Sequence, residues 1–494
     1  MPTIRYAAAI IITRNNGSEK QVFLVRRNPA LRFMGGYWAF PGGTVIPEDQ
    51  HGSADDQELT FLHCALRELF EETGILLGAM DTTLNPPQRQ RLRQQLLDAT
   101  ASDAWVKTLH VAPPDYHRLE LVANLITPPF SQIVYDTRFF HLVLDDGIEP
   151  AMVNGELVDS GFYAPADAVR LWQRGELDLA PPVLFLLRLL AGADFEEFKA
   201  QIASQTRKFR AGALIPIYFV PGIFMTPLTT PTLPPATTTN TYIVGQDRLY
   251  LVDPATPDQT EQQRLFAVMD EMLAAGKRFE AILLTHHHAD HVGAVTAVSQ
   301  RYQLRLRAHP LTYQRLAGGY LPGPPLHDGE RLDLGPAPDG VKDWQLLVIH
   351  TPGHAVDHLC FLESRYQSAL VGDMLSTVST IIIDPPEGHM RTYLNSLARL
   401  RGLPIKTVFP AHGPAQQDGL RLIGKLLEHR QERENKIIQA LGVNVQGIDE
   451  LLPRVYDDVA PSVYPVAARS LLAGLIKLEE DGVCRRHPQG WLLT

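Results

Sequence analysis

A cluster of histidines with one aspartate lies just past the middle of the chain, after an apolar run. Residues 279–284 predict a buried strand, and it is followed within one turn by His286, His288, Asp290 and His291. Because alternate residues leaving a strand point the same way, His286 and His288 can reach one metal ion while Asp290 and His291 face a second. Imidazole nitrogens with carboxylate oxygens favour two zinc ions, Zn²⁺, with water between them. A solvated loop rich in histidine is the alternative.

Three later predicted strands also end in side chains that bind metals. The apolar runs 344–349, 369–371 and 406–409 are followed by His354, Asp373 and His412. Random placement of the 18 histidines of the chain would seldom put such residues at several strand ends. The four strand ends therefore predict one shared edge that holds two ions.

Two metal ions at one edge would make a hydrolytic site. Each ion withdraws charge, so a water shared between them ionises near neutral pH, where free water does not. The hydroxide can attack an ester, a thioester, a lactam or a phosphodiester, the second ion stabilises the developing charge, and Asp290 can orient the nucleophile. His309 and His358 are candidates for supporting the ligands, while Arg391 and Tyr393 either bind substrate or lie on an exposed loop.

A second set of charged residues lies near the start of the chain, on a predicted helix over residues 59–73. Glu68, Glu71 and Glu72 stand at i, i+3 and i+4, so three carboxylates crowd one face. A divalent cation would relieve their repulsion, and hard oxygen ligands favour Mg²⁺ or Mn²⁺. A solvated acidic face is the alternative.

These residues, with the glycines before them, resemble the Nudix box. The matching residues are Gly42, Glu48 and the run Arg67-Glu68-Leu69-Phe70-Glu71-Glu72-Thr73-Gly74-Ile75, with eighteen residues between Glu48 and Arg67 where the family pattern has seven. The resemblance implies that the three glutamates hold magnesium and assist water attack on a diphosphate linked to a nucleoside, and it leaves open which of them acts as the base. Residues 27–43, 127–140 and 175–182 are similar to the coenzyme A diphosphatase-like branch, so the resemblance covers roughly residues 1–200.

The histidine cluster and its partners resemble the metallo-β-lactamase fold superfamily, with its His-x-His-x-Asp-His motif and a later His, Asp and His. That family has an αββα sandwich. The resemblance implies that one zinc is bound by His286, His288 and His354, and the other by Asp290, His291 and His412, with Asp373 bridging the two. Residues 239–242 and the C-terminal tail resemble the glyoxalase II-related branch, which contains an endoribonuclease of lactamase fold.

Bulk composition is that of an ordinary globular protein. The chain has 494 residues, 45% hydrophobic and 20% charged, which is enough for about three domains with cores of their own. The net charge of -10 argues against a protein with the broadly basic surface that is typical of nucleic-acid binding. Three scattered cysteines make no disulfide framework, and no apolar run reaches the ~20 residues that span a bilayer, so we expect a cytoplasmic protein without a membrane partner.

The order of these patterns predicts an α/β and α+β multidomain protein. We expect a Nudix α/β/α sandwich over residues 1–210, a linker rich in proline and threonine with an opening strand over 211–240, a metallo-β-lactamase αββα sandwich over 241–419, and a winged-helix-like module over 420–494. In the last part, helices are predicted at 420–441 and 466–480, before a strand pair at 482–493.

The leading functional hypothesis is a bifunctional metal-dependent hydrolase. The substrate is expected to be a small molecule such as a nucleotide or a coenzyme A conjugate. A coenzyme A conjugate would offer a cleavable bond to each site, because it contains a diphosphate and often a thioester. An RNA-processing endonuclease is one alternative, although the acidic net charge counts against it. The other is a lactamase-fold hydrolase controlled by a Nudix domain that senses a ligand without catalysis.

Overall fold

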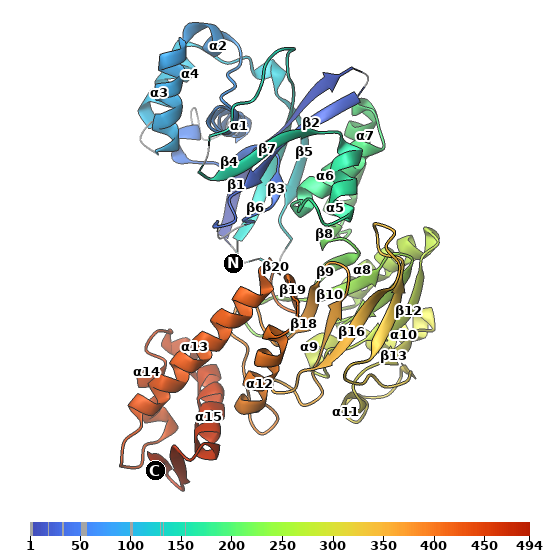
Figure 1. Ribbon diagram of the computed structural model, residues 1–494, viewed down its shortest axis with the longest axis vertical. Helices are drawn as coiled ribbons and strands as arrows, with labels where there is room; N and C mark the ends of the chain where they lie inside the picture. Colours follow the sequence, from blue (N-terminus) through green and yellow to red (C-terminus); the bar gives the residue numbers. More distant parts are fainter. Residues whose placement is uncertain are drawn as a thin grey trace. The chain divides into compact units, whose positions relative to one another are not determined.

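The computed structural model describes residues 3–17, 19–31, 34–50, 57–98, 102–128, 130–131, 133–153 and 155–494. The chain divides into two compact units, Met1–Pro221 and Gly222–Thr494 (Figure 1). Part of the long spacer between Glu48 and Arg67, residues 51–56, and Pro129 of the coenzyme A-type motif lie outside the described residues. Within the described part of the chain, no helix is both long and apolar enough to cross a membrane.

The first unit is built around a mixed sheet whose strands run in the order β3-β2-β1-β6-β5, with β4 beside β1 and β7 beside β2 (Figure 1). The long central strands β1 and β6 are parallel, and β2 and β5 flank them in antiparallel orientation. The strands of this sheet are β1 Thr3–Asn16, β2 Glu19–Arg27, β3 Trp38–Ala39, β4 Gly42–Thr44, β5 Glu120–Ile126, β6 Ile133–Val143 and β7 Leu157–Tyr163; β8 Ile217–Val220, at the end of the unit, is not a strand of this sheet.

Helices cover both faces of this sheet. Ile10 and Ile12 of β1 share a core cluster with Phe61 and Leu69 of α1, while the equally buried Ile11 points to the opposite face, because side chains alternate along a strand. The arrangement is the expected α/β/α sandwich, and it sets α1 directly against β1 and β4. The helices are η1 Pro47–Asp49, α1 Gln57–Thr73, α2 Ala79–Thr83, α3 Pro86–Leu97, α4 Ser102–Val111, η2 Tyr116–Arg118, α5 Pro165–Gln173, α6 Pro181–Ala191 and α7 Phe195–Arg210.

The second unit contains two sheets. In one the strands run β14-β13-β12-β11-β10-β9, and in the other β15-β16-β17-β18-β19-β20. The pairs β11–β12 and β18–β19 are parallel, so their carboxyl ends meet at the same edge of each sheet. The strands are β9 Ile223–Thr229, β10 Thr238–Gly245, β11 Arg248–Val252, β12 Arg278–Leu283, β13 Arg305–Arg307, β14 Leu321–Pro322, β15 Arg331–Gly335, β16 Trp344–His350, β17 Leu359–Glu363, β18 Ser368–Gly372, β19 Thr407–Pro410 and β20 Gln416–Gln417.

Helices lie against both sheets, which gives the expected αββα arrangement. Helix α8 contacts β12 and β9, whereas Leu397 and Leu400 of α12 share a core cluster with Val371 of β18. The ring of Tyr242 on β10 meets that of Phe409 on β19 edge to face, with centroids 5.7 Å apart, so the two sheets are in contact. The helices are α8 Gln259–Ala274, α9 Ala289–Val292, α10 Val295–Tyr302, α11 Pro310–Tyr313 and α12 Met390–Arg401.

The stretch expected to be a linker, residues 211–240, contains strands. Strands β8 and β9 fall inside it, and β9 pairs along its whole length with β10. Pro227 belongs to β9 and is buried, so the prolines did not exclude a strand here.

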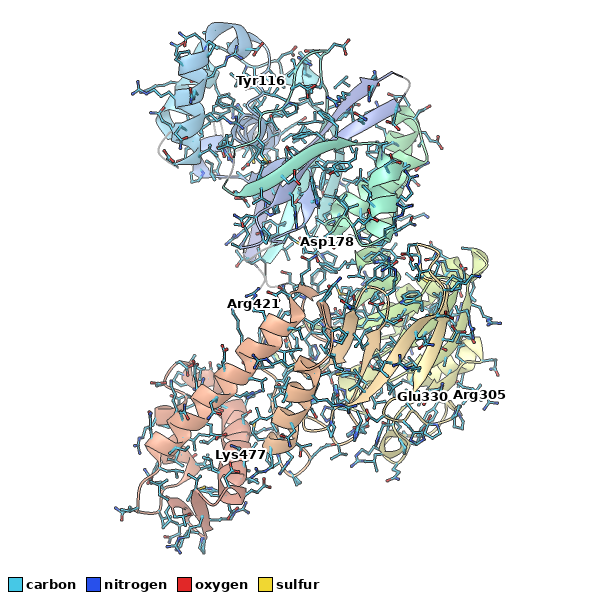
Figure 2. All side chains as sticks on the ribbon, in the orientation of Figure 1. Tyr116, Asp178, Arg305, Glu330, Arg421 and Lys477 are labelled. Carbon is cyan, nitrogen blue, oxygen red and sulfur yellow. The ribbon has the colours of Figure 1, made fainter. Side chains whose placement is uncertain are left out.

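The tail is a helical module with a terminal hairpin. Its elements are α13 Gly419–Ala440, α14 Ile448–Val455, η3 Pro461–Val463, α15 Tyr464–Glu480, β21 Cys484–His487 and β22 Gly490–Leu493. The side chains of Leu451, Leu471 and Trp491 share its core. Lys477 of α15, labelled in Figure 2, pairs with Glu434 of α13 at 2.6 Å, which joins the two long helices. The sequence predicted α13, α15 and the hairpin, but not α14.

Candidate metal centres

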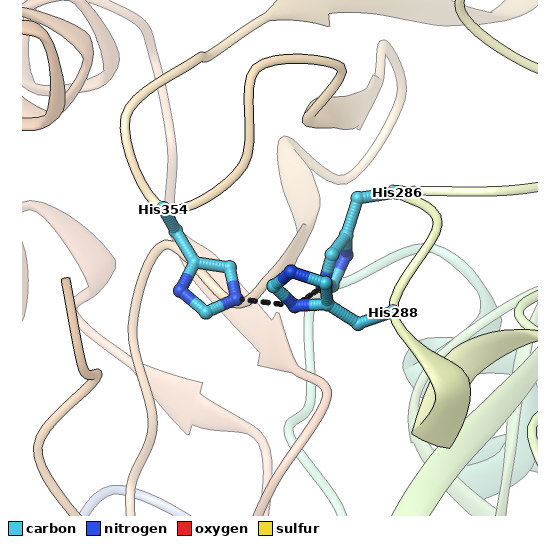
Figure 3. Close-up of side chains that lie close together, drawn as sticks. All are labelled: His286, His288 and His354. Atoms are coloured by element: carbon cyan, nitrogen blue, oxygen red, sulfur yellow. Dashed lines mark hydrogen bonds between the residues drawn. The ribbon is translucent and has the colours of Figure 1, made fainter. Parts of the chain in front are cut away.

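Three histidine side chains converge where β12 and β16 end. Nε2 of His286 and Nε2 of His354 each lie 3.0 Å from Nδ1 of His288 (Figure 3). His286 and His288 leave the end of β12 two residues apart, and His354 follows β16 in a tight turn. These three ring nitrogens form a group that could hold one metal ion.

A second group lies beside the first, at the carboxyl ends of β12 and β19. Asp290, His291 and His412 bring their ligand atoms close enough to share an ion. Asp373 lies between the groups, because its Oδ1 is 3.4 Å from Nε2 of His412 and its Oδ2 is 3.5 Å from Nε2 of His354. The structure therefore gathers all seven side chains that the sequence singled out, from four strand ends.

Two buried polar atoms at this edge suggest what the side chains are arranged to hold. Among the described residues, Nε2 of His291 and Oδ1 of Asp373 have no hydrogen-bond partner. An unsatisfied buried polar atom costs about 1–3 kcal/mol, so such atoms are rare without a reason. Imidazole nitrogens and carboxylate oxygens are the donor set of zinc and similar borderline cations, and the residues fit a pair of such ions.

Burial keeps His286 and His288 neutral. Burial and the neighbouring His354 lower the pKa of His288 to about 3, and burial followed by His291 lowers the pKa of His286 well below its usual value. A neutral imidazole has a free lone pair, which is the form that binds a metal ion.

The second group balances buried charges of opposite sign. Burial would lower the pKa of His291, but Asp290 and Asp253 raise it well above its usual value. Burial would raise the pKa of Asp373, but His412 and His291 hold it well below its usual value. Asp373 is therefore ionised and offers both oxygens to the edge.

Asp253, which the sequence pattern did not assign to the site, orients the histidine loop. It follows β11 with a positive φ of 49°, and Oδ1 accepts a 2.8 Å hydrogen bond from the backbone N–H of Thr285. Its Oδ2 accepts from Oγ1 of Thr285 at 2.7 Å and lies 2.9 Å from Nδ1 of His291. A carboxylate on one ring nitrogen directs the other nitrogen of His291 toward the metal group. The available signal was an acidic residue directly after an apolar strand, as at Asp373.

Asp253→Ala is expected to lower the free energy of unfolding of the second unit by about 3 kcal/mol, because it leaves the N–H of Thr285 and Nδ1 of His291 without their buried acceptor. Chemical denaturation followed by hydrogen exchange of β12 measures the loss. Asp247→Ala, in the exposed turn before β11, is the matched control. Equal stability of the two variants would contradict the orienting role of Asp253.

Two further buried groups contact Asp373 and His412. The backbone N–H of Asp373 donates to Nε2 of His358 at 3.0 Å. Gly372 allows this approach, since it has a φ of 47° and a Cβ there would lie 2.6 Å from the same nitrogen. Nδ1 of His412 lies 3.0 Å from the carbonyl oxygen of Thr238. His358 thus touches the backbone of a predicted ligand, as expected.

His309, Arg391 and Tyr393 contact other parts of the fold. Nδ1 of His309 accepts from the backbone N–H of Leu311 and caps α11. Arg391 and Tyr393 belong to α12 and not to a loop: Arg391 pairs with Glu480 at 2.9 Å, and Tyr393 is fully buried. The interpretation of these two as exposed loop residues was wrong, because the helical segment packs on the tail.

The first unit gathers its carboxylates around one buried arginine of α1. Nη1 of Arg67 donates to Glu68 at 2.8 Å and to Glu71 at 3.2 Å. Its Nε and Nη2 form a paired contact with both oxygens of Asp49, at 3.0 and 2.9 Å. Glu48, the acid expected from the box spacing, is half-buried one residue earlier in η1. Asp49 is the acid that meets Arg67, and sequence reasoning missed it.

The glycine turn brings the backbone of β4 against the acidic helix. The backbone N–H of Gly42 donates to Oε2 of Glu72 at 2.9 Å. A Cβ at Gly43 would lie 2.2 Å from Oε1 of Glu68, so a larger residue there would displace that carboxylate. Gly74 ends α1 with a φ of 74°, as the box pattern predicts.

Crowding and burial make these carboxylates reluctant to ionise. Burial raises the pKa of Glu68 to about 7, against the opposing effect of Arg67. Burial and then Glu68 raise the pKa of Glu72 well above its usual value, and burial raises that of Glu71. Carboxylates held together in this way fit a hard divalent cation, which removes the repulsion between them.

Comparison with known proteins assigns each part of the chain. The model of the NUDIX domain matches residues 3–122, that of the metallo-beta-lactamase superfamily matches 234–412, and that of the beta-lactamase associated winged helix domain matches 448–491. The solved structure of a NUDIX hydrolase from Alicyclobacillus acidocaldarius is 26% identical with a TM-score of 0.36, and the match covers 40% of this chain and 97% of that one.

Curated relatives are similar to part of the chain. Lactamase-like protein adaB of Aspergillus niger is 28% identical over 41% of this chain, which spans 58% of the length of that protein. Atrochrysone carboxyl ACP thioesterase nsrC of Aspergillus novofumigatus is 30% identical, over 49% of this chain and 74% of that protein. The chain therefore belongs to the metallo-β-lactamase superfamily, with a Nudix domain before that domain and a winged helix domain after it, and both the Nudix and the metallo-β-lactamase families are families of metal-dependent hydrolases.

Proposed function

We propose that the second unit is a dizinc hydrolase of esters or thioesters. The observation that carries this proposal is the gathering of seven ligand-type side chains around two buried atoms that lack partners. We assign one ion to His286, His288 and His354, the other to Asp290, His291 and His412, and the bridging position to Asp373. When bound, such a pair of ions supplies Lewis acidity that ionises water near neutral pH and stabilises an oxyanion.

The protein's own residues prepare this chemistry. Asp253 fixes the ring of His291, and Asp373 offers an ionised carboxylate to both groups. Asp290, at the N-terminal turn of α9, is placed to accept a proton from the attacking water and orient it. The relative named as a carboxyl ACP thioesterase supports a thioester as the bond that is cleaved.

We infer that the first unit hydrolyses a diphosphate linked to a nucleoside, using Mg²⁺ or Mn²⁺ held by Glu68, Glu71 and Glu72. Arg67 and Asp49 keep these carboxylates in place. A coenzyme A thioester is the substrate class that serves both sites, since one molecule carries a diphosphate and an acyl thioester. We also infer domain boundaries at residues 221 and 419, since β9 and β10 belong to one sheet.

Glu71→Gln is expected to lower diphosphate cleavage of an acyl-coenzyme A about 100-fold, because it removes one anionic ligand, and to leave thioester hydrolysis unchanged. Chromatography of the products from an acyl-coenzyme A panel, with added magnesium and zinc, separates the two reactions. Glu58→Gln, at the exposed first turn of the same helix, is the control. If the wild-type protein cleaved no diphosphate, the proposed activity of the first unit would be contradicted.

A further inference from the structure

His288 has a second ring nitrogen that faces away from the first histidine group. Its Nδ1 points to His286 and His354, while its Nε2 lies 3.8 Å from Oε2 of Glu387. A neutral imidazole carries one N–H, so a lone pair on Nδ1 requires the hydrogen on Nε2. A carboxylate facing Nε2 favours that tautomer and turns Nδ1 toward the metal group.

Glu387 belongs to the segment between β18 and α12, and a chain of contacts holds it there. Its Oε1 lies 3.3 Å from Nε2 of His287, whose Nδ1 lies 2.9 Å from Oδ1 of Asp357. Asp357 is fully buried and accepts a 2.6 Å hydrogen bond from Oγ1 of Thr312. His287, between two ligand-type histidines in the sequence, therefore lies between Glu387 and the buried Asp357.

The same residues could be considered as a site for a third cation, since His287, His288 and Glu387 bring their ligand atoms together. Two observations argue against it. His288 already directs Nδ1 into the first group, and Nε of Arg315 lies 3.8 Å from Oε1 of Glu387. A guanidinium at that distance would repel a divalent ion.

We propose that Glu387 is a positioning residue for His288, and that it sets the affinity of the first zinc site. This inference rests on the proposed dizinc function of the second unit. Glu387 contacts no substrate in this role and acts through the ring of His288.

The test is zinc affinity in the full-length protein, measured by competition with a chromophoric chelator in excess magnesium, which occupies the carboxylates of the first unit. Glu387→Ala is expected to weaken the binding of one zinc ion about 10- to 100-fold and to leave the other unchanged. Glu387→Gln keeps an acceptor without the charge, so its affinity should lie between those of Glu387→Ala and the wild type. Asp384→Asn, in the same segment but paired with Arg469, should match the wild type.

The following results would contradict the proposal. Unchanged affinity for both ions in Glu387→Ala, or an equal loss at both sites, would overturn the positioning role. A third zinc ion in the wild-type protein that is lost in Glu387→Ala would make Glu387 a ligand and also overturn it. A wild-type protein that binds no zinc would contradict the dizinc function itself. Thermal unfolding of the zinc-free variants shows whether folding is preserved.

Discussion

Replacing Asp373 with asparagine is expected to lower kcat/KM for ester or thioester hydrolysis by about 10³-fold, which corresponds to about 4 kcal/mol of lost transition-state stabilisation. The carboxylate faces three imidazoles, at 3.4 Å from His412, 3.5 Å from His354 and 3.6 Å from His291. Asparagine has nearly the same shape but no charge, and it turns an N–H₂ group toward one metal group. One substitution therefore affects both proposed ions.

The measurement is steady-state hydrolysis of a thioester with the zinc content of each preparation determined in parallel. Asp339→Asn, which removes the carboxylate that pairs with Arg365, is the matched control in the same unit and should retain activity. Diphosphate cleavage by the first unit should be unaffected, since its carboxylates lie in the other unit. Wild-type kcat/KM with Asp373→Asn would show that Asp373 does not bridge the ions.

The sheet edge that gathers the seven metal-binding-type side chains could be predicted because each of them follows a recognisable strand in the sequence. Where an apolar strand is followed directly by His, Asp or Gly-Asp, the candidate metal-binding residue can be identified from the local sequence. Parallel pairing of β11 with β12 and of β18 with β19 then brings these strand ends together. Once the strands were recognised, their shared edge followed. His358 could be proposed for the same reason, since it lies four residues after His354.

The supporting residues could not be predicted in this way, because their partners are distant in the sequence. Asp253 meets His291 across 38 positions, and Glu387 reaches His288 across about a hundred, from a segment with no regular pattern. Asp49, one residue after the expected Glu48, makes the contact with Arg67, beside a spacer of eighteen residues where the family pattern has seven. Contacts between residues so distant in the sequence are set by the packing of the folded chain, which no local pattern specifies.

Two elements that the sequence did not place contain proline. Pro227 belongs to β9, within the predicted linker and opening strand, and Pro453 lies inside α14, where no helix was predicted. Proline disfavours strands and helix interiors through its missing N–H and its ring. Burial of apolar neighbours outweighs that local cost: Met225 and Leu228 of β9, and Leu451 of α14, are fully buried.

Arg67→Ala is expected to destabilise the first unit by about 3–5 kcal/mol at pH 8 without magnesium, because it leaves Asp49, Glu68 and Glu71 buried without their shared cation. Burial already raises the pKa of Glu68 to about 7, so the folded state binds a proton more tightly than the unfolded chain. Stability therefore falls as pH rises from the usual glutamate range through 7, and it is unaffected below that range.

Removing Arg67 strengthens that dependence, since the guanidinium opposes the rise in the pKa of Glu68 and Glu71. The gap between variant and wild type should be small near pH 4 and grow toward pH 8, and Mg²⁺ should narrow it by restoring positive charge. Hydrogen exchange of β1 in the full-length protein measures the stability of this unit alone. Arg91→Ala, on the exposed side of α3, is the control. A loss of stability that is equal at every pH would mean that Arg67 acts by packing and not by its charge.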